Sequence, residues 1–372
     1  MTDQLIWLKK KKVWNYVLFL GCFSNTNFLS FNLLYLLLPL LAIYWFDKIT
    51  QKPVITDARF FMTSFLSGLF FMISQSVISQ GPVHLFSTFI LTFSFLYPVI
   101  ALDLYKHITR DDLRNFLSDS IRIILIFYTA EFLTRVLNPV ETQTGIYRLK
   151  GSLFFFDSNF VGLNLVILFG FLLYLKKEGF PGAAKYLWIT LILIISTLSR
   201  ASIFTAVCSY LIFTGNRRSM KYKLFLGAIL LTGLFIYMII STDLQNIDGS
   251  FRSKFLIILN AFNTFIHLPL TGQLLGIGLN NTKLYLNVWS HNFLVMYILE
   301  TGITGFTLLM LVFYSWCKLT GWKALFVLGP FLINGFSLST YFLAPVFLLI
   351  AIIYIIEQNK TQHEDSVYYT LA

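Results

Sequence analysis

The sequence predicts an all-α polytopic membrane protein with about twelve transmembrane helices. Hydrophobic residues make up 57% of the chain, charged residues only 12%, and the mean hydropathy is +0.73. A soluble domain carries about 25% charged residues. A membrane-spanning helix needs about 20 mainly apolar residues, so twelve of them take up on the order of 240 residues. We therefore expect residues 1–372 to form a single integral membrane domain.

The predicted spans follow the apolar runs in order, and turn-forming clusters such as Gln80–Pro82 and Gly179–Gly182 separate them. The first and eighth runs are short, so their limits are the least sharply defined. We expect spans at about 13–24, 29–46, 59–79, 85–105, 116–137, 159–175, 185–199, 201–215, 223–241, 293–316, 322–338 and 340–357.

The distribution of Lys and Arg predicts the orientation of these spans. Cytoplasmic segments of membrane proteins carry an excess of Lys and Arg. Most of the 28 basic residues fall on one side if both termini are cytoplasmic, for example Lys9–Lys12, Lys106 with Arg110, and Arg217 with Arg218. This bias explains the net charge of +11 without a nucleic-acid partner, and it predicts a protein that crosses the bilayer many times with both termini in the cytoplasm.

Two outward-facing segments are substantial, at about 138–158 and 242–292, and long loops in compact proteins are usually functional. The second is a periplasmic loop between the ninth and tenth spans. Its apolar residues recur at helical spacing, which predicts an amphipathic helix at the membrane interface; these residues are Phe251, Phe255, Leu259, Phe262 and Ile266. Pro269 should end this helix, and Gly272, Gly276 and Gly278 should form turns after it.

Three outward arginines are candidates for binding an anion. Arg200 lies at a tight turn between two spans, Arg148 precedes the sixth span together with Lys150, and Arg252 opens the amphipathic helix. Charges at membrane depth are costly and usually functional, and planar guanidinium groups bind diphosphates in a bidentate way. The alternative is that these side chains only anchor the protein at the interface.

His291 is the best candidate for a general base on the outer face. It precedes the tenth span beside Asn292, and an unperturbed histidine titrates near pH ~6.5, so it can accept a proton from a hydroxyl group. The alternative is a histidine that only caps the helix or lies at the interface, and His267 is the second candidate base. Glu300, half-buried in the tenth span, should lie near the opposite helix face from His291. No histidines and carboxylates have metal-ligand spacing, so we expect neither a metal nor a cofactor.

Other polar and small residues in the spans have structural interpretations. Glu131 and Arg135 lie four residues apart in the fifth span, which predicts an ion pair on one helix face. Gly302 and Gly305 in the tenth span should allow close helix packing.

Several motifs occur together and in a fixed order. His291-Asn292 is followed by Gly302-Ile303-Thr304-Gly305, Arg252 and Leu256 have the spacing of an Arg-x-x-x-Leu motif, and Ser199-Arg200-Ala201 lies upstream. The segments Arg148–Gly151 and Asp157–Asn159 come earlier still. Over about 145–310 this pattern resembles the bacterial O-antigen polymerases and O-antigen ligases, although Phe306 replaces the small or β-branched residue common in the ligases.

The resemblance implies a metal-independent membrane glycosyltransferase with a fold similar to the C class. Its donor would be an oligosaccharide linked to undecaprenyl diphosphate, and a chain-length regulator protein is a possible partner. By this resemblance Arg200 and Arg252, with Arg148 and supported by Lys150, would hold the diphosphate. His291, supported by Asn292, would deprotonate the acceptor hydroxyl for an inverting attack.

Four functions remain open at this point. The compact length, the 40 phenylalanines and the Arg148–Asn159 segment favour a polymerase, which joins lipid-linked repeats. A ligase would transfer the glycan to the lipid A core. A flippase for the same lipid should have internal repeats and polar groups at mid-membrane, and the sequence has no evident repeat. A peptidoglycan-type glycan polymerase would use a carboxylate in the outer loop, for which Asp248 is the candidate.

Overall fold

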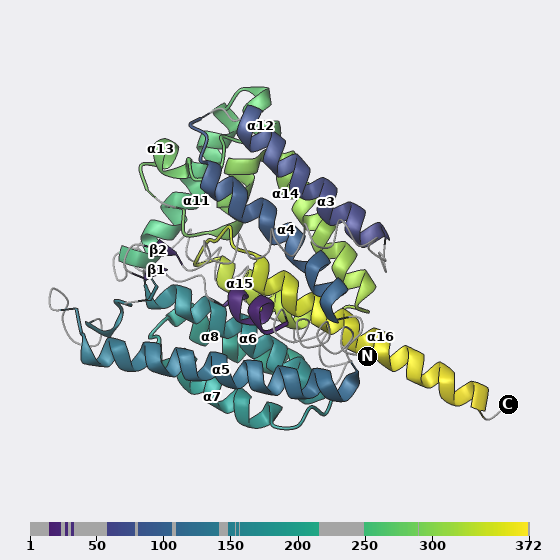
Figure 1. The fold of residues 1–372 in the computed structure, drawn as a ribbon. Helices are drawn as coiled ribbons and strands as arrows, with labels where there is room; N and C mark the ends of the chain where they lie inside the picture. The colour runs from purple at the N-terminus through teal and green to yellow at the C-terminus, as the bar shows by residue number, and fades with distance from the viewer. Residues whose placement is uncertain are drawn as a thin grey trace.

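The computed structural model describes residues 15–23, 27–28, 31–32, 58–78, 81–105, 109–140, 148–152, 154–155, 157–215, 249–288 and 290–370 (Figure 1). Within them the protein is helical, apart from β1 (Asn27–Phe28), which pairs antiparallel with β2 (Phe31–Asn32). The helices are α3 (Ala58–Ile73) with the π-helical turn η1 (Ser74–Ile78), α4 (Leu85–Tyr105), α5 (Arg110–Leu137), α6 (Ser158–Lys177), α7 (Ala183–Ser196), α8 (Arg200–Phe213), α11 (Gly249–His267), α12 (Leu270–Leu275), α13 (Thr282–Leu286), α14 (Phe293–Leu319), α15 (Leu325–Gly335) and α16 (Ala344–Thr370). The all-α prediction is therefore confirmed.

Most predicted spans coincide with a helix. The span at 85–105 has the bounds of α4. Helix α5 begins at Arg110 rather than 116, because the Thr109 side chain caps it and Asp111 and Asp112 stabilise its first turn. Helix α16 begins at Ala344 rather than 340, so Tyr341 lies in the preceding loop. The span at 223–241 and most of the span at 29–46 lie outside the described residues.

Helix α6 is the centre of one group of helices. It packs against α7, α8 and α15, and most of its residues are buried. Glycines allow these close contacts: a Cβ atom on Gly162 would lie 2.3 Å from Ser202 Oγ, and one on Gly170 would lie 1.9 Å from the carbonyl oxygen of Phe326. Helices α3, α4 and α14 form a second group, and α16 packs against α4 between the two groups before its last turns project from the body (Figure 1).

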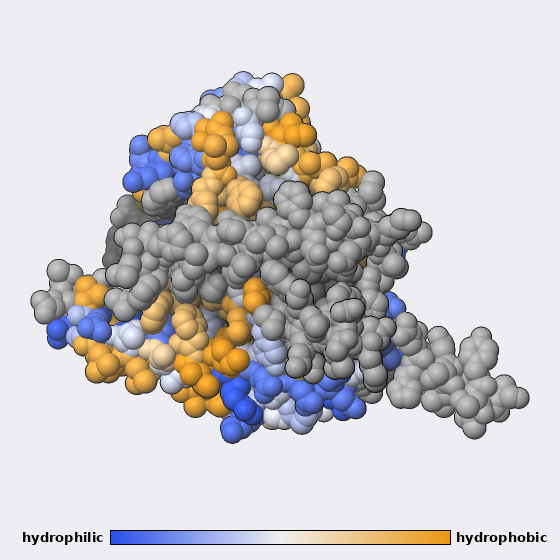
Figure 2. Space-filling view, in the orientation of Figure 1, coloured by the Kyte–Doolittle hydropathy of each residue, from blue (hydrophilic) through white to orange (hydrophobic). Residues whose placement is uncertain are grey.

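Several described helices are apolar, and parts of their surface are exposed. Two helices, α6 and α14, are long and apolar enough to cross a membrane, and α7, α8 and α15 are among the shorter apolar helices. Large apolar side chains are exposed on α5 and α7, for example Leu137 at 76% and Ile192 at 65%. In Figure 2 these apolar surfaces form orange areas in the lower part of the view. Helices and surface together indicate membrane association.

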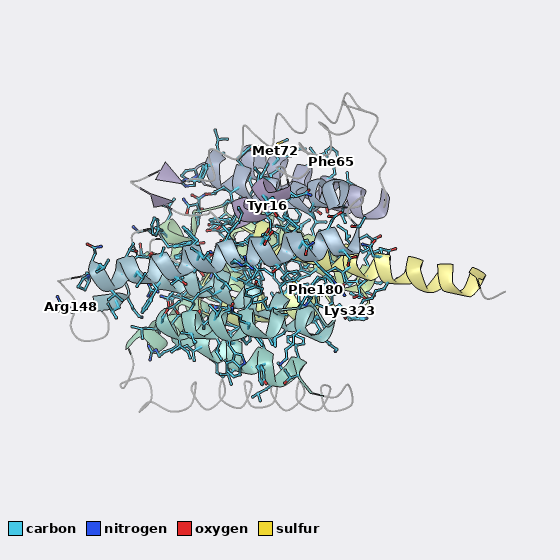
Figure 3. The ribbon with its side chains drawn as sticks, turned by 60° about the horizontal axis from the view of Figure 1, so that its bottom comes forward. Tyr16, Phe65, Met72, Arg148, Phe180 and Lys323 are labelled. Carbon is cyan, nitrogen blue, oxygen red and sulfur yellow. The ribbon has the colours of Figure 1, made fainter. Side chains whose placement is uncertain are left out.

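The loops predicted to face opposite sides of a membrane lie at opposite ends of α5. Arg148 is at one end of the molecule, whereas Phe180 and Lys323 are at the other (Figure 3). At this second end, Glu178 after α6 binds Lys323, with Nζ to Oε1 at 3.5 Å, and also pairs with Lys360 of α16. Both lysines pair with Glu357, so this network ties the end of α6 and the turn before α15 to the middle of α16.

The predicted ion pair of Glu131 and Arg135 is confirmed and is fully buried. Arg135 Nε lies 3.0 Å from Glu131 Oε1. The guanidinium group also donates to the carbonyl oxygens of Leu149 and Ser196, and Glu131 accepts a hydrogen bond from the Ser152 hydroxyl at 2.6 Å. The pair therefore joins α5 to the Arg148–Ser152 segment and to the end of α7, which is a structural role.

Candidate functional site

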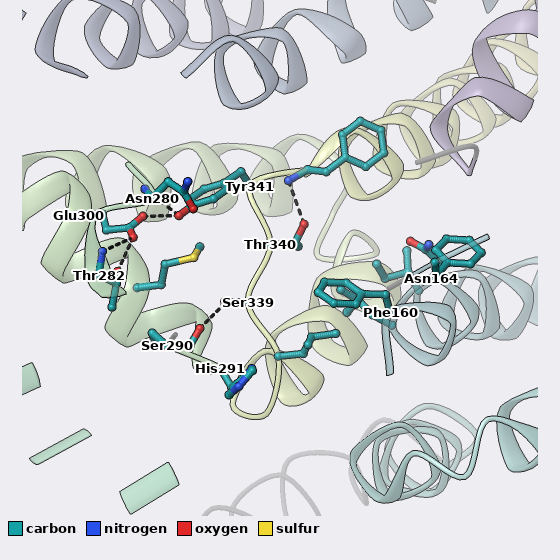
Figure 4. Close-up of a pocket in the computed structure, with 16 residues that line it drawn as sticks. Phe160, Asn164, Asn280, Thr282, Ser290, His291, Glu300, Ser339, Thr340 and Tyr341 are labelled. Carbon is teal, nitrogen blue, oxygen red and sulfur yellow. Dashed lines mark hydrogen bonds between the residues drawn. The ribbon is translucent and has the colours of Figure 1, made fainter. Parts of the chain in front are cut away.

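A cavity of about 610 Å³ opens where the ends of several helices meet, and His291 lines it. Its walls come from the first half of α6, the turn between α12 and α13, the start of α14 and the loop between α15 and α16 (Figure 4). Four of the lining residues are aromatic, namely Phe155, Phe160, Tyr341 and Phe342. Ligand sites are typically concave and apolar with a few precisely placed polar groups, and this cavity has that character.

His291 is held in place by both of its neighbours. Asn292 caps α14, because its Oδ1 accepts from the Val295 N–H at 3.1 Å, and its Nδ2 donates to the Phe336 carbonyl oxygen at 3.3 Å. On the other side, the Ser339 hydroxyl donates to the Ser290 carbonyl oxygen at 2.5 Å. His291 itself is exposed. The backbone is thus fixed while the imidazole ring remains accessible, as a general base requires. The supporting role predicted for Asn292 fits this geometry.

Glu300 also lines the cavity, and the expectation that it is half-buried was wrong. It is 1% exposed. Its Oε1 accepts from the Thr282 N–H at 3.1 Å and from the Thr282 hydroxyl, and its Oε2 accepts from the Tyr341 hydroxyl at 2.6 Å. The Asn280 N–H donates to the Tyr341 oxygen at 2.9 Å, so the phenol is held from both sides. Burial, followed by the charge of Glu300, raises the pKa of Tyr341 well above its usual value, so this hydroxyl stays protonated.

The backbone of α14 is irregular just after Glu300. Gly302 has φ of 69° and ψ of −179°, so the helix is interrupted there. The carbonyl oxygens of Leu299 and Glu300 accept instead from Ile277 and Gly278, both at 3.0 Å. A Cβ atom on Gly302 would lie 2.3 Å from the carbonyl oxygen of Leu274. Gly302 therefore does more than permit helix packing, because only glycine allows both the backbone angle and this contact.

Gly302→Ala should strongly destabilise the protein. The substitution combines a strained positive φ with a backbone clash, and together these should cost about 2–5 kcal/mol. Gly321→Ala is a matched control, because Gly321 also has a positive φ of 57° but a Cβ atom there meets nothing within 4 Å. Equilibrium unfolding in detergent micelles measures both free energies. Equal losses in the two variants would contradict the proposed contact between Gly302 and Leu274.

Arg200 is the first residue of α8, and this helix packs against α6 and α15. Ser199 caps the helix, and Ser202 accepts a hydrogen bond from Asn334 Nδ2 at 3.0 Å near the end of α15. The α15–α16 loop that follows lines the cavity. Arg200 is exposed and is not among the residues that line the cavity. A cationic side chain at a helix N-terminus, where the helix dipole is positive, favours an anion.

Neither Arg148 nor Lys150 is among the residues that line the cavity. Arg148 is exposed in a short 3₁₀ turn, and Lys150 is partly exposed beside it. Their carbonyl oxygens accept from the Val140 and Ser158 N–H groups at 2.9 and 3.0 Å, which fixes this segment against the start of α6. Arg252 lies in the first turns of α11, but its side chain is outside the described part of the chain.

A helix covers the amphipathic stretch as predicted, and the second candidate base is separate from the cavity. Helix α11 spans the amphipathic pattern, and Pro269 separates it from α12. His267 ends α11, and its Nδ1 donates to the Asn263 carbonyl oxygen at 2.7 Å. It does not line the cavity. Asp248 lies outside the described residues. Among residues that the structure describes, no group of three His, Cys, Asp or Glu residues could hold a metal ion.

Comparisons with known proteins identify no relative: no family model, no curated protein and no solved structure matches this chain.

Proposed function

We propose that the protein is an O-antigen polymerase, a membrane glycosyltransferase that joins repeat units linked to undecaprenyl diphosphate. The observation that carries this proposal is the position of His291. It lies in the motif that resembles the O-antigen polymerases and ligases, and it lines a cavity with polar groups and aromatic walls. An exposed imidazole on a fixed backbone beside such a cavity suits a general base that acts on a sugar hydroxyl.

The proposed setting is the bacterial inner membrane. The chain would cross it about twelve times with both termini in the cytoplasm and residues 242–292 in the periplasm, in a fold similar to the C class of glycosyltransferases. The separation of the basic inner loops from Arg148 along α5 supports this orientation (Figure 3). The two helices α6 and α14, which are long and apolar enough to cross a membrane, support membrane insertion.

The proposed reaction is a direct displacement at the anomeric carbon. His291 accepts the proton of the acceptor hydroxyl, the acceptor oxygen forms a bond to the anomeric carbon, and the bond from that carbon to the diphosphate oxygen breaks with inversion. The leaving diphosphate gains negative charge, and Arg200 and Arg252, with Arg148 and Lys150, stabilise it. Fixed positive charges directed at a developing anion can supply much of the catalytic effect. The reaction as written uses neither a metal nor a cofactor.

An O-antigen ligase is the second candidate, because it shares the donor and the resemblance. Only the acceptor differs: a second lipid-linked repeat for a polymerase, and the lipid A core for a ligase. A flippase for the same lipid is a third and weaker candidate. The cavity contains a candidate base as well as several polar groups, which favours an enzyme over a transporter. In a polymerase, a chain-length regulator protein would be the partner that sets product size.

A strain that lacks the gene separates these functions by its lipopolysaccharide gel. A polymerase predicts that the ladder is lost and that a band of core plus one repeat remains. Loss of every O-antigen band, with lipid-linked polymer accumulating, would identify a ligase instead. An unchanged ladder would contradict the O-antigen substrate and would direct attention to a capsule or an exopolysaccharide.

A further inference from the structure

We infer that Asn334 is a positioning residue that fixes the separation between Arg200 and His291, and hence between the leaving diphosphate and the base. This inference rests on the proposed function, because it concerns the geometry of the same reaction. Asn334 is 1% exposed and lies in the last turn of α15. This helix packs against α8, which begins at Arg200, and against α14, which His291 precedes.

The side chain of Asn334 is bonded to the first turn of α8. Its Nδ2 donates to the Ser202 hydroxyl at 3.0 Å, and that hydroxyl donates in turn to the Ser199 hydroxyl, also at 3.0 Å. Ser199 caps α8, because its Oγ accepts from the Ser202 N–H. Arg200 stands between these two serines, so a shift of Asn334 would move the backbone that carries the guanidinium group.

The backbone of the same turn is bonded to the segment around His291. The Phe336 carbonyl oxygen accepts from Asn292 Nδ2 at 3.3 Å, and Asn292 directly follows His291. The two helix ends also touch, since a Cβ atom on Gly335 would lie 3.1 Å from the Phe293 Cβ atom. The last turn of α15 therefore contacts the start of α8 on one side and the start of α14 on the other.

Asn334 also opens the loop that lines the cavity. Its carbonyl oxygen accepts from the Ser337 N–H at 2.8 Å, which closes the turn after α15. Further along this loop Ser339 lines the cavity, and its hydroxyl donates to the Ser290 carbonyl oxygen (Figure 4). His291 is thus bonded to the end of α15 and the loop after it through the residues on either side of it.

A direct displacement needs the base and the leaving group at a fixed separation. The acceptor oxygen must approach the anomeric carbon opposite to the diphosphate oxygen, and a misplacement of about 1 Å can cost about 10²-fold in rate. Arg200 and His291 belong to different helices, so their separation depends on what joins α8 to α14. Asn334 is not among the residues that line the cavity, so it acts through Ser202 and through the backbone of its own turn.

The test is a double-mutant cycle with Asn334→Ala, Ser202→Ala and the double variant, all as purified full-length protein in detergent. Each single variant should lower kcat for glycosyl transfer at least about tenfold, while KM for the lipid-linked repeat and the affinity for farnesyl diphosphate change less than about threefold. In the double variant the loss of kcat should be smaller than the product of the single losses, because both variants remove the same hydrogen bond.

Tyr174→Phe is the matched control, because it removes a hydrogen bond of 2.6 Å from α6 to Glu357 of α16, at the other end of α6. It should keep the wild-type kcat, so the cycle separates the position of the bond from the loss of a bond between helices as such. If Asn334→Ala were too unstable to purify, Ser202→Ala would remove the same bond from its other side.

A wild-type kcat in both single variants would overturn the inference. Equal losses of kcat and of farnesyl diphosphate affinity would overturn it too, because Asn334 would then support only the diphosphate site. A double variant that shows the full product of the single losses would overturn the shared bond. If the wild-type protein neither bound farnesyl diphosphate nor elongated lipid-linked repeats, the proposed function would fail and the inference with it.

Discussion

His291→Ala should lose about 10²–10⁴ of the rate of glycosyl transfer, the usual contribution of a general base. Farnesyl diphosphate should still bind, because the arginines rather than the imidazole hold the diphosphate. His291→Gln should be nearly as inactive, since glutamine preserves hydrogen bonding but cannot accept a proton at neutral pH. The measurement is chain elongation by purified protein with undecaprenyl-diphosphate-linked repeat units, with variants matched for amount and fold.

His267→Ala is the matched control, because this histidine lies in the same long loop but outside the cavity. It should keep most of the wild-type rate. Elongation by His291→Gln at a near wild-type rate would show that His291 is structural. Asp248, the carboxylate expected in the peptidoglycan-type alternative, would then be the next base to test.

Sequence patterns predicted the local features of this protein well. Helix α4 coincides with its apolar run, and helix α11 coincides with the amphipathic period that ends before Pro269. Such features depend on side-chain periodicity and on proline, both of which act within a few residues. His291 immediately precedes a helix whose start is capped by Asn292, as its position before the tenth apolar run predicted, whereas the cavity that it lines was not predicted.

Glu300 was missed because its position depends on distant parts of the chain. An ideal helix from His291 to Glu300 would place the two side chains on nearly opposite faces, but α14 begins only at Phe293, so His291 lies before the helix. The partner hydroxyl comes from Tyr341, in a loop that the apolar pattern assigned to a span. One sequence signal was available: an acidic residue in an apolar run, two positions before a glycine.

The same distinction between local and distant contacts applies to the arginines. Arg200 was placed correctly at the start of a helix, since Ser199 is a good capping residue. Its relation to the cavity depends on Asn334 and on the close approach of Gly162 to α8, which no local pattern contains. Variants of Arg200 and Arg252 therefore test whether these cations bind the diphosphate.

Arg200→Ala and Arg252→Ala should each lose about 10²–10³ of the transfer rate, the scale found when one donor to a developing anion is removed. Arg200→Lys and Arg252→Lys should recover only part of it. Lysine restores the charge but not the planar fork that binds two oxygens of a diphosphate at once. Farnesyl diphosphate affinity should fall in parallel with the rate, because the same contacts hold the ground state and the leaving group.

Arg114→Ala is the control for the loss of an arginine as such. Its guanidinium group lies 3.7 Å from Asp111, and both residues lie near the start of α5. Asp111 is exposed and Arg114 is partly exposed, and a surface pair of this kind contributes little to stability, so the variant should retain nearly full rate and affinity. If Arg200→Ala behaved like Arg114→Ala at equal protein level, Arg200 would serve only as an interfacial anchor. Full rescue by lysine would instead show that charge alone, without bidentate geometry, stabilises the leaving group.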